Sequence, residues 1–281
     1  MKLLLNLFFA LNIIVSAQVF SDSDKEICST KFQLILDKNL STLPINDLVT
    51  EIGKTFINTE YIAHTLETEG DEKLVVNLSG LDCTTFLETA ITFARTVKKG
   101  KYDLESYLDE LKYIRYRNGN LDGYASRLHY FSDWIYNNVE KEIVKDITKE
   151  IGGKKISFDV WYMSKNFEAY RMLKANPKYI PIIQEQEKAI RSRTYYYIPK
   201  SEVNLFEDKI QNGDLIAITT NLKGLDISHV GIAVKMQNGR IHFMHAPLVG
   251  AKVQISPEPI QQYLEKIKKH TGIIVLRPLE P

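Results

Sequence analysis

The sequence predicts an α+β fold, in which a mostly helical first half packs against an antiparallel sheet built from the second half. Apolar residues recur at helical spacing in several segments between positions 45 and 147. Five short β-rich segments, separated by turn residues, follow between positions 214 and 277. Helices first and strands later are typical of this class rather than of alternating parallel units. The 281 residues, 44% of them hydrophobic and 25% charged, suffice for a large globular core.

The N-terminus has the pattern of a secretory signal. Lys2 is its only charge, Leu3 to Val15 is an apolar run, and Val15-Ser16-Ala17 supplies the small residues of a cleavage site. The run is short for a bilayer span. We therefore expect cleavage after Ala17 and an exported, periplasmic protein without stable membrane insertion, folded as a single domain over residues 18–281.

Four segments have the apolar spacing of amphipathic helices, namely Ile45 to Phe56, Thr84 to Val97, Leu104 to Tyr116 and Asp133 to Ile147. The second is the clearest, because Lys98 and Lys99 favour a last helical turn and Gly100 favours a stop. Residues 150–200 are rich in Tyr and Lys and have no clear period. We expect this stretch to cover the functional site or to connect the two halves.

Five segments in the second half favour strands, namely Asp214 to Thr220, His229 to Met236, Arg240 to His245, Ala251 to Ile255 and Ile273 to Arg277. The second and third form a hairpin, whose loop length decides which face each histidine occupies. A three-residue loop, residues 237–239, places Gly239 at its left-handed position and brings His229 and His245 to one face. A two-residue loop separates them. We predict the three-residue loop.

Charge and cysteine content exclude several classes of protein. The formal net charge is +1, from 36 basic and 35 acidic residues, which argues against a nucleic-acid partner. Only Cys28 and Cys83 are present, too few for a disulfide-rich scaffold or an all-cysteine zinc site. A single bridge between them remains open. Cys28 lies in a polar stretch, and we expect it to be peripheral and dispensable.

Cys83 is the candidate nucleophile. It opens the clearest helix, where unpaired backbone N–H groups and the helix dipole favour a thiolate. With His229 as base and His245 as the group that orients the base, the sequence offers a nucleophilic triad. The alternatives are a structural thiol at Cys83 and a zinc site formed by Asp226, His229 and His245.

Several segments together resemble the DUF1460 branch, the N-acetylmuramoyl-L-alanine amidase-like members of the NlpC/P60 cysteine peptidases. The general NlpC/P60 features are Asp82-Cys83 at a helix start, Gly213-Asp214-Leu215-Ile216, Ser228-His229-Val230-Gly231-Ile232 and Met244-His245-Ala246. The features of the branch are Tyr61-Ile62-Ala63-His64-Thr65-Leu66-Glu67, Leu81-Asp82-Cys83-Thr84-Thr85-Phe86, and Tyr116-Arg117-Asn118-Gly119 running into Gly123-Tyr124-Ala125-Ser126-Arg127-Leu128-His129-Tyr130.

The resemblance implies a papain-like core and a cell-wall amidase that uses no cofactor or metal. Cys83 matches the family nucleophile, His229 the base and His245 the third polar residue. The implied bond is the amide between N-acetylmuramic acid and L-alanine, in peptidoglycan fragments (muropeptides). The substrate-binding candidates are Tyr61, His64, Asp82, Tyr116, Arg117, Tyr124, Ser126, Arg127, His129 and Ser228. Arg117 and Arg127 suit the substrate's carboxylates, since guanidinium binds carboxylate in a bidentate way.

Three other functions remain open on the sequence alone. The same fold could cut the D-γ-glutamyl–diamino-acid bond of the stem peptide, as NlpC/P60 relatives do. A zinc-dependent amidase and a wall-binding module without activity are the others. We expect a monomer.

Overall fold

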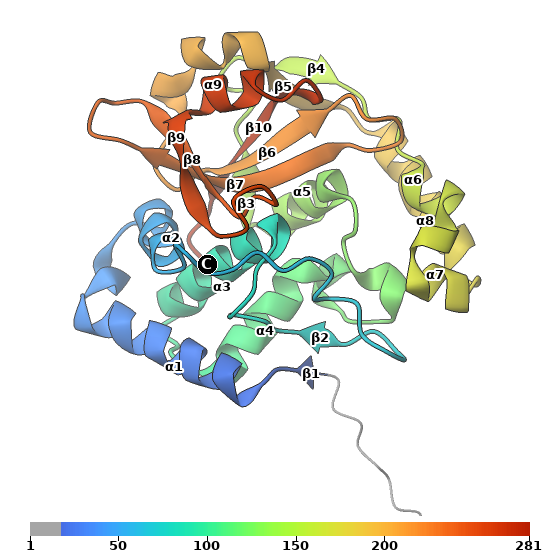
Figure 1. The fold of residues 1–281 in the computed structure, drawn as a ribbon, viewed down its shortest axis with the longest axis horizontal. Coiled ribbons are helices and arrows are strands. Elements are labelled where there is room, and N and C mark those ends of the chain that lie inside the picture. The colour runs from blue at the N-terminus through green and yellow to red at the C-terminus, as the bar shows by residue number, and fades with distance from the viewer. Residues whose placement is uncertain (1–17) are drawn as a thin grey trace, which may run out of the picture.

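The structure, a computed structural model, describes residues 18–281, so the predicted signal sequence lies outside the described residues. The described chain begins with a short strand, β1 (Gln18–Val19), which pairs in parallel with β2 (Leu74–Val75). A layer of helices from the first half lies against a sheet from the second half (Figure 1).

The helical layer is centred on α3. Its members are α1 (Asp22–Asp37), α2 (Ile45–Lys54), α3 (Cys83–Lys98), α4 (Leu104–Arg115) and α5 (Phe131–Glu140). Nearly every residue of α3 after Thr84 is buried, because α2 and α4 pack on its sides and β7 packs across it. The helices predicted at 45–56, 84–97 and 104–116 are confirmed, each within two residues at both ends.

The main sheet has the strand order β4-β5-β10-β6-β7-β8-β9, and β3 also pairs with β10. The strands are β3 (Val144–Asp146), β4 (Lys154–Ile156), β5 (Tyr195–Pro199), β6 (Leu215–Thr220), β7 (Ile227–Lys235), β8 (Ile241–His245), β9 (Gln254–Pro259) and β10 (His270–Pro278). All its pairs are antiparallel, which confirms the predicted α+β class.

Each face of this sheet has its own apolar core, as the alternation of side chains along strands requires. Val230, Ile232 and Met244 face the core shared with α2 and α3. Phe243 and Ala233 face a second core, which includes Ile260 and Leu264 of α9 (Ile260–Glu265). The histidine-bearing strands β7 and β8 therefore lie between two packed layers.

Two predicted elements have other bounds in the structure than in the prediction. The segment 133–147 is not one helix: α5 ends at Glu140, Glu142 takes a left-handed φ of 54°, and β3 begins at Val144. Pairing with β10 overrides the helical pattern there. The strand predicted at 251–255 begins instead at Gln254, since Ala251 has a φ of 51°.

The polar stretch around Cys28 forms α1, a helix that the sequence analysis missed. Cys28, Phe32 and Ile35 recur at helical spacing and are all buried in the main core. The expectation that Cys28 is peripheral is therefore wrong, because its side chain faces inward from an otherwise polar helix. Cys28 and Cys83 are both free thiols, so the bridge left open by the sequence does not form.

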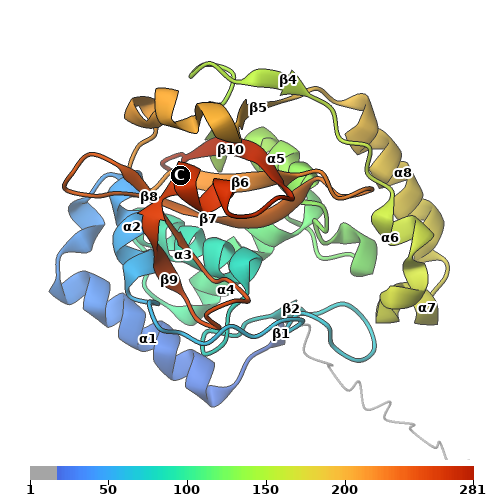
Figure 2. The ribbon, with the colours of Figure 1, turned by 45° about the horizontal axis from the view of Figure 1, so that its top comes forward.

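The helical part of residues 154–199 forms an arm at one side of both layers, shown in yellow-green to ochre in Figure 2. It contains α6 (Tyr162–Lys165), α7 (Arg171–Ala175) and α8 (Tyr179–Ser192), between the sheet strands β4 and β5. Buried Glu187 of α8 accepts hydrogen bonds from Tyr130 Oη at 2.8 Å and from the Ser164 N–H at 3.0 Å, which fixes the arm to the start of α5. Within residues 18–281, no helix has the length and apolar character needed to cross a membrane.

Candidate active site

Cys83 is the first residue of α3, directly after the N-cap residue Asp82. The Asp82 carboxylate accepts the Thr85 N–H at 2.8 Å, and the Asp82 carbonyl accepts the Phe86 N–H at 2.9 Å. The N–H groups of Cys83 and Thr84 precede this first helical bond and are not used by the cap. They are therefore the candidate donors for an oxyanion next to the thiol.

The hairpin has the predicted three-residue loop. Ile232 pairs with Met244, the Met236 N–H donates to the Arg240 carbonyl at 2.9 Å, and Gly239 has a φ of 79°. This register brings the two histidines together: His229 Nε2 lies 2.7 Å from His245 Nδ1. Since Nε2 of His229 is engaged by His245, Nδ1 is the nitrogen left for a proton from a substrate or a thiol.

Cys83 and His229 line one cavity of about 230 Å³. The start of α3, the start of β7 and the segment before α5 form its walls, and the arm contributes Met163 and Tyr170. The arm therefore covers part of the site, as expected for residues 150–200. Besides Cys83, Ser228 and His229, the lining residues are Thr84, Leu128, His129, Tyr130, Phe131, Met163, Tyr170, Leu225, Asp226, Ile227 and Val230.

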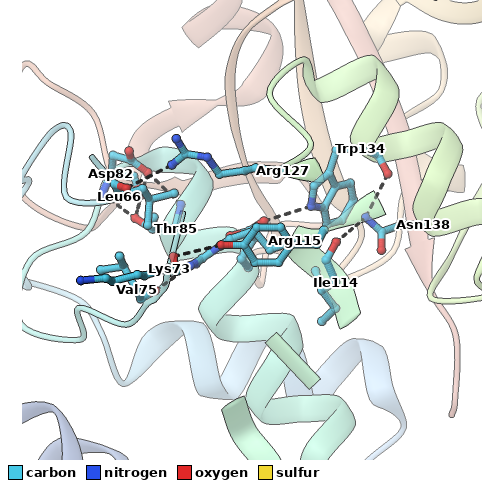
Figure 3. A network of polar contacts seen from close by, with 12 residues as sticks. Leu66, Lys73, Val75, Asp82, Thr85, Ile114, Arg115, Arg127, Trp134 and Asn138 are labelled. Atoms are coloured by element: carbon cyan, nitrogen blue, oxygen red, sulfur yellow. Dashed lines mark hydrogen bonds and ion pairs between the residues drawn. The ribbon is translucent and has the colours of Figure 1, made fainter. Parts of the chain in front are cut away.

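A second cavity of about 200 Å³ shares Thr84, Leu128 and His129 with the first. Its other lining residues are His64, Leu66, Glu67, Asp82, Glu88, Arg115 and Arg127. Arg127 carries its positive charge here, next to the start of α3 (Figure 3). The site thus consists of a reaction cavity at the thiol and an adjoining cavity that contains a buried cation.

Burial dominates the electrostatics of the thiol. It raises the pKa of Cys83 to about 11, and the Asp82 charge adds to the rise, although the N–H groups of Val230 and Thr84 lower it. Burial, with the charges of His245, His270 and Lys269, holds the pKa of His229 well below its ordinary value. The sequence analysis expected a thiolate at the helix start. The structure favours a neutral thiol beside a neutral imidazole, since desolvation outweighs the helix terminus.

His245 is 1% exposed, and burial lowers its pKa to about 3. It is therefore neutral at ordinary pH, and only one of its ring nitrogens carries a proton. If His229 is to accept a proton at Nδ1, its Nε2–H must donate to Nδ1 of His245. His245 is then protonated at Nε2, so one tautomer of each ring is compatible with a basic His229.

Five of the predicted substrate-binding residues line the two cavities, and a sixth lies beside the thiol. His64, Asp82, Arg127, His129 and Ser228 line them. Tyr61 is half-buried beside the thiol, and both burial and the Cys83 charge raise its pKa. His64 takes a φ of 61°, a left-handed conformation that is uncommon for a residue with a side chain.

The structure does not bring the other four to the cavities, and each has a structural role instead. Tyr116 is buried and its hydroxyl donates to Glu72 at 3.0 Å, while Arg117 forms an ion pair with Asp133. Tyr124 is buried under His129, with ring centroids 4.3 Å apart. Ser126 Oγ donates to the Gly123 carbonyl at 2.7 Å and accepts the Asp122 N–H at 2.9 Å, which closes a turn.

The zinc alternative lacks a ligand set. The Asp226 carboxylate accepts the Ser132 N–H at 2.7 Å and so caps the start of α5. Across residues 18–281, no three His, Cys, Asp or Glu side chains are grouped to hold a metal ion. The residues present therefore favour a thiol site over the zinc triad that the sequence left open as an alternative.

The chain belongs to the AmiA-like family, described as N-acetylmuramoyl-L-alanine amidase-like, whose family model matches residues 51–273. No curated protein gives a match.

Several solved structures share the fold. An N-acetylmuramoyl-L-alanine amidase from Bacteroides uniformis is 36% identical, with a TM-score of 0.79 over 84% of this chain and 99% of that one. A Bacteroides fragilis protein provisionally named a xylanase is 39% identical, with a TM-score of 0.76 over 81% and 99%. A DUF1460 protein from Legionella pneumophila is 26% identical, with a TM-score of 0.67 over 93% and 98%. These findings confirm the predicted resemblance to the DUF1460 amidase-like proteins.

Proposed function

We propose that the protein is a cysteine-dependent N-acetylmuramoyl-L-alanine amidase acting on peptidoglycan fragments. The observation that carries the proposal is the 2.7 Å contact between His229 Nε2 and His245 Nδ1, with His229 and Cys83 in the wall of one cavity. A nucleophile, a base and a group that orients the base are the parts that acyl transfer by a thiol requires. The family and its solved amidase relative support the choice of bond.

The reaction begins from the neutral pair. As Cys83 Sγ bonds to the lactyl carbonyl carbon of muramic acid, its proton passes to Nδ1 of His229. The imidazolium so formed keeps its Nε2–H bond to His245. The negative charge that develops on the carbonyl oxygen faces the N–H groups of Cys83 and Thr84. A single donor of this kind is typically worth about 10²–10³ in rate.

Collapse of this intermediate breaks the amide bond. His229 returns its proton to the L-alanine nitrogen, which leaves as an amine with the stem peptide. A muramoyl thioester remains on Cys83. His229 then takes a proton from water, whose oxygen attacks the thioester carbon, and the thiol is regenerated with the released carboxylic acid. No cofactor or metal takes part.

The second cavity is our candidate for the stem peptide because it adjoins the reaction cavity and shares Thr84, Leu128 and His129 with it. Arg127 is 6% exposed and already pairs with Glu67 at 2.7 Å and Glu72 at 3.3 Å. A substrate carboxylate would therefore share the guanidinium with two acidic side chains. His129 donates its Nε2–H to the Tyr124 carbonyl at 2.9 Å, which leaves Nδ1 as an acceptor for a peptide N–H.

We also propose that the protein belongs to the NlpC/P60 superfamily and acts in the periplasm. A cysteine at a helix start, packed on a sheet whose strands carry the two histidines, supports a papain-like NlpC/P60 core. A periplasmic, monomeric enzyme released by signal cleavage fits a substrate made of wall fragments.

The test uses the chain from residue 18 onward and its Cys83→Ala variant, incubated with N-acetylmuramoyl-L-Ala-D-γ-Glu-diaminopimelate. Mass spectrometry should find free tripeptide and N-acetylmuramic acid with the native chain and neither product with the variant. The matched control is Cys28→Ala, which removes the buried thiol of α1 and should retain activity. EDTA should have no effect.

Other products would change the proposal. Release of diaminopimelate with a muramoyl dipeptide would move the cut to the stem peptide. Activity that survives Cys83→Ala but is lost in EDTA would replace the thiol mechanism by a metal-dependent one. Absence of any hydrolysis would favour a wall-binding module.

A further inference from the structure

One ring nitrogen of the histidine pair has no hydrogen-bond partner. His245 is almost fully buried, and its Nδ1 contacts His229 at 2.7 Å. Its Nε2 is buried and unpaired among residues 18–281. Buried polar atoms without a partner are rare and costly, so this one calls for an explanation.

Two aromatic rings surround the imidazole of His245. Phe243, two residues earlier on β8, stacks on it with ring centroids 4.7 Å apart and planes at 30°. Tyr263 of α9 meets it edge to face, at 5.0 Å and 77°. Phe243 covers one face of the imidazole and His229 occupies its Nδ1 edge. The steep angle between the rings of His245 and Tyr263 is the one at which an N–H edge can point at the face of its neighbour.

We propose that the ring face of Tyr263 accepts the Nε2–H of His245 and thereby holds the histidine pair in the tautomer that leaves His229 a base. N–H groups directed at an aromatic face form weak hydrogen bonds of this kind. The contact supplies a partner for the otherwise unpaired nitrogen. Tyr263 is then a positioning residue, which acts through His245 and does not touch the substrate.

The pair has two neutral arrangements, and only one is productive. In the first, His229 donates its Nε2–H to His245, which is protonated at Nε2, and His229 Nδ1 is free to accept the thiol proton. In the second, His245 donates its Nδ1–H to His229, whose own proton lies at Nδ1, so His229 cannot act as a base. An aromatic face beside Nε2 of His245 stabilises the first arrangement only.

The catalytic meaning of this inference rests on the proposed function, but the tautomer can be measured without any activity. The experiment records nitrogen chemical shifts of the six histidines in protein labelled with ¹⁵N-histidine, and His245→Gln identifies the signals of His245. In the native chain, Nε2 of His245 should be protonated and Nδ1 should not. In Tyr263→Leu, which removes the aromatic face, the signals should move toward the other arrangement.

Kinetics on the muramoyl tripeptide give the second readout. Tyr263→Leu should lower kcat about two- to fivefold, the size of one weak hydrogen bond, with KM unchanged. Tyr263→Phe retains the ring and should retain most of kcat and the native spectrum. Gln262→Leu, a neighbouring substitution on α9, controls for a general effect on the helix.

Each outcome decides a separate claim. A native His245 protonated at Nδ1, a Leu variant with unchanged spectrum and kcat, or a Phe variant that behaves like the Leu variant would overturn the role of the ring. If the native chain hydrolyses nothing but Tyr263→Leu shifts the tautomer, the proposed function fails and the contact stands. If Cys83-dependent hydrolysis is found without the shift, only the inference fails.

Discussion

Asp82 and Thr85 cap α3 reciprocally: the Asp82 carboxylate accepts the Thr85 N–H at 2.8 Å, and Thr85 Oγ1 accepts the Asp82 N–H at 2.9 Å. This capping box fixes the start of the helix at the residue that carries the thiol. The same carboxylate charge raises the pKa of Cys83. One residue thus both positions the thiol and disfavours its ionisation.

Asp82→Asn and Asp82→Ala should separate these two effects. Asn can still accept the Thr85 N–H, so its cost in stability should be small, whereas Ala should cost about 1 kcal/mol. Both remove the charge and should lower the pKa of Cys83, which shifts thiol alkylation by iodoacetamide to lower pH. Denaturant titration and alkylation rates across pH measure the two quantities. An unchanged alkylation profile in Asp82→Asn would show that the charge does not act on the thiol.

The neutral histidines predict loss of stability in acid. Burial lowers the pKa of His129 and of His245 to about 3, against 6.5 for an unfolded histidine. The unfolded chain therefore binds more protons below pH 6.5, and the free energy of unfolding should fall between about pH 6.5 and pH 3. Above pH 6.5 these residues should cause no pH dependence. The melting temperature measured across pH, in the native chain and in His129→Gln, tests this. His129→Gln should flatten the acid slope, and an equally steep slope in that variant would contradict the assignment.

Glu88 of α3 lines the second cavity and joins three elements. Figure 3 labels its two partners, Arg115 and Trp134. The Glu88 carboxylate accepts Arg115 Nε–H at 2.7 Å from α4 and Trp134 Nε1–H at 3.2 Å from α5. Glu88→Ala leaves a buried guanidinium without its partner and should cost about 3–5 kcal/mol. Denaturant unfolding measures this cost. Glu105→Ala, an exposed glutamate on α4, should change stability little, and a similarly small loss in Glu88→Ala would show that the pair is replaceable.

Features that depend on local sequence patterns, such as helix starts and the hairpin register, could be predicted from the sequence. Features that depend on contacts between distant segments could not. The register of the hairpin followed from Gly239, and the start of α3 followed from the residues around Cys83. The ion pair of Arg117 could not be predicted, because its partner Asp133 lies sixteen residues away on α5. The arm was expected near the site, but its helices and its contacts could not be predicted. Met163 and Tyr170 line the cavity in an arm that is held by the contacts of Glu187 with Tyr130 and Ser164. The neutral state of the thiol likewise depends on burial, which no local motif predicts.

Two glycines of the same hairpin allow a matched test of how backbone packing positions the histidine pair. A methyl group on Gly231 would lie 2.5 Å from the Met244 carbonyl oxygen and 2.8 Å from the Phe243 ring, so β7 and β8 must shift. A methyl group on Gly239 would contact nothing within 4 Å, and only its left-handed φ opposes the change. Gly231→Ala should therefore cost about 1–3 kcal/mol and displace His245 from His229.

Gly239→Ala should cost about 1 kcal/mol and leave the pair in place. We expect amidase turnover to fall at least tenfold in Gly231→Ala and to stay within twofold in Gly239→Ala, as a 1 Å displacement of catalytic groups costs up to about 10²-fold. Turnover is measured at a temperature where both variants are fully folded. Equal turnover in the two variants would mean that the close contact between β7 and β8 at Gly231 is not what aligns His229 with His245.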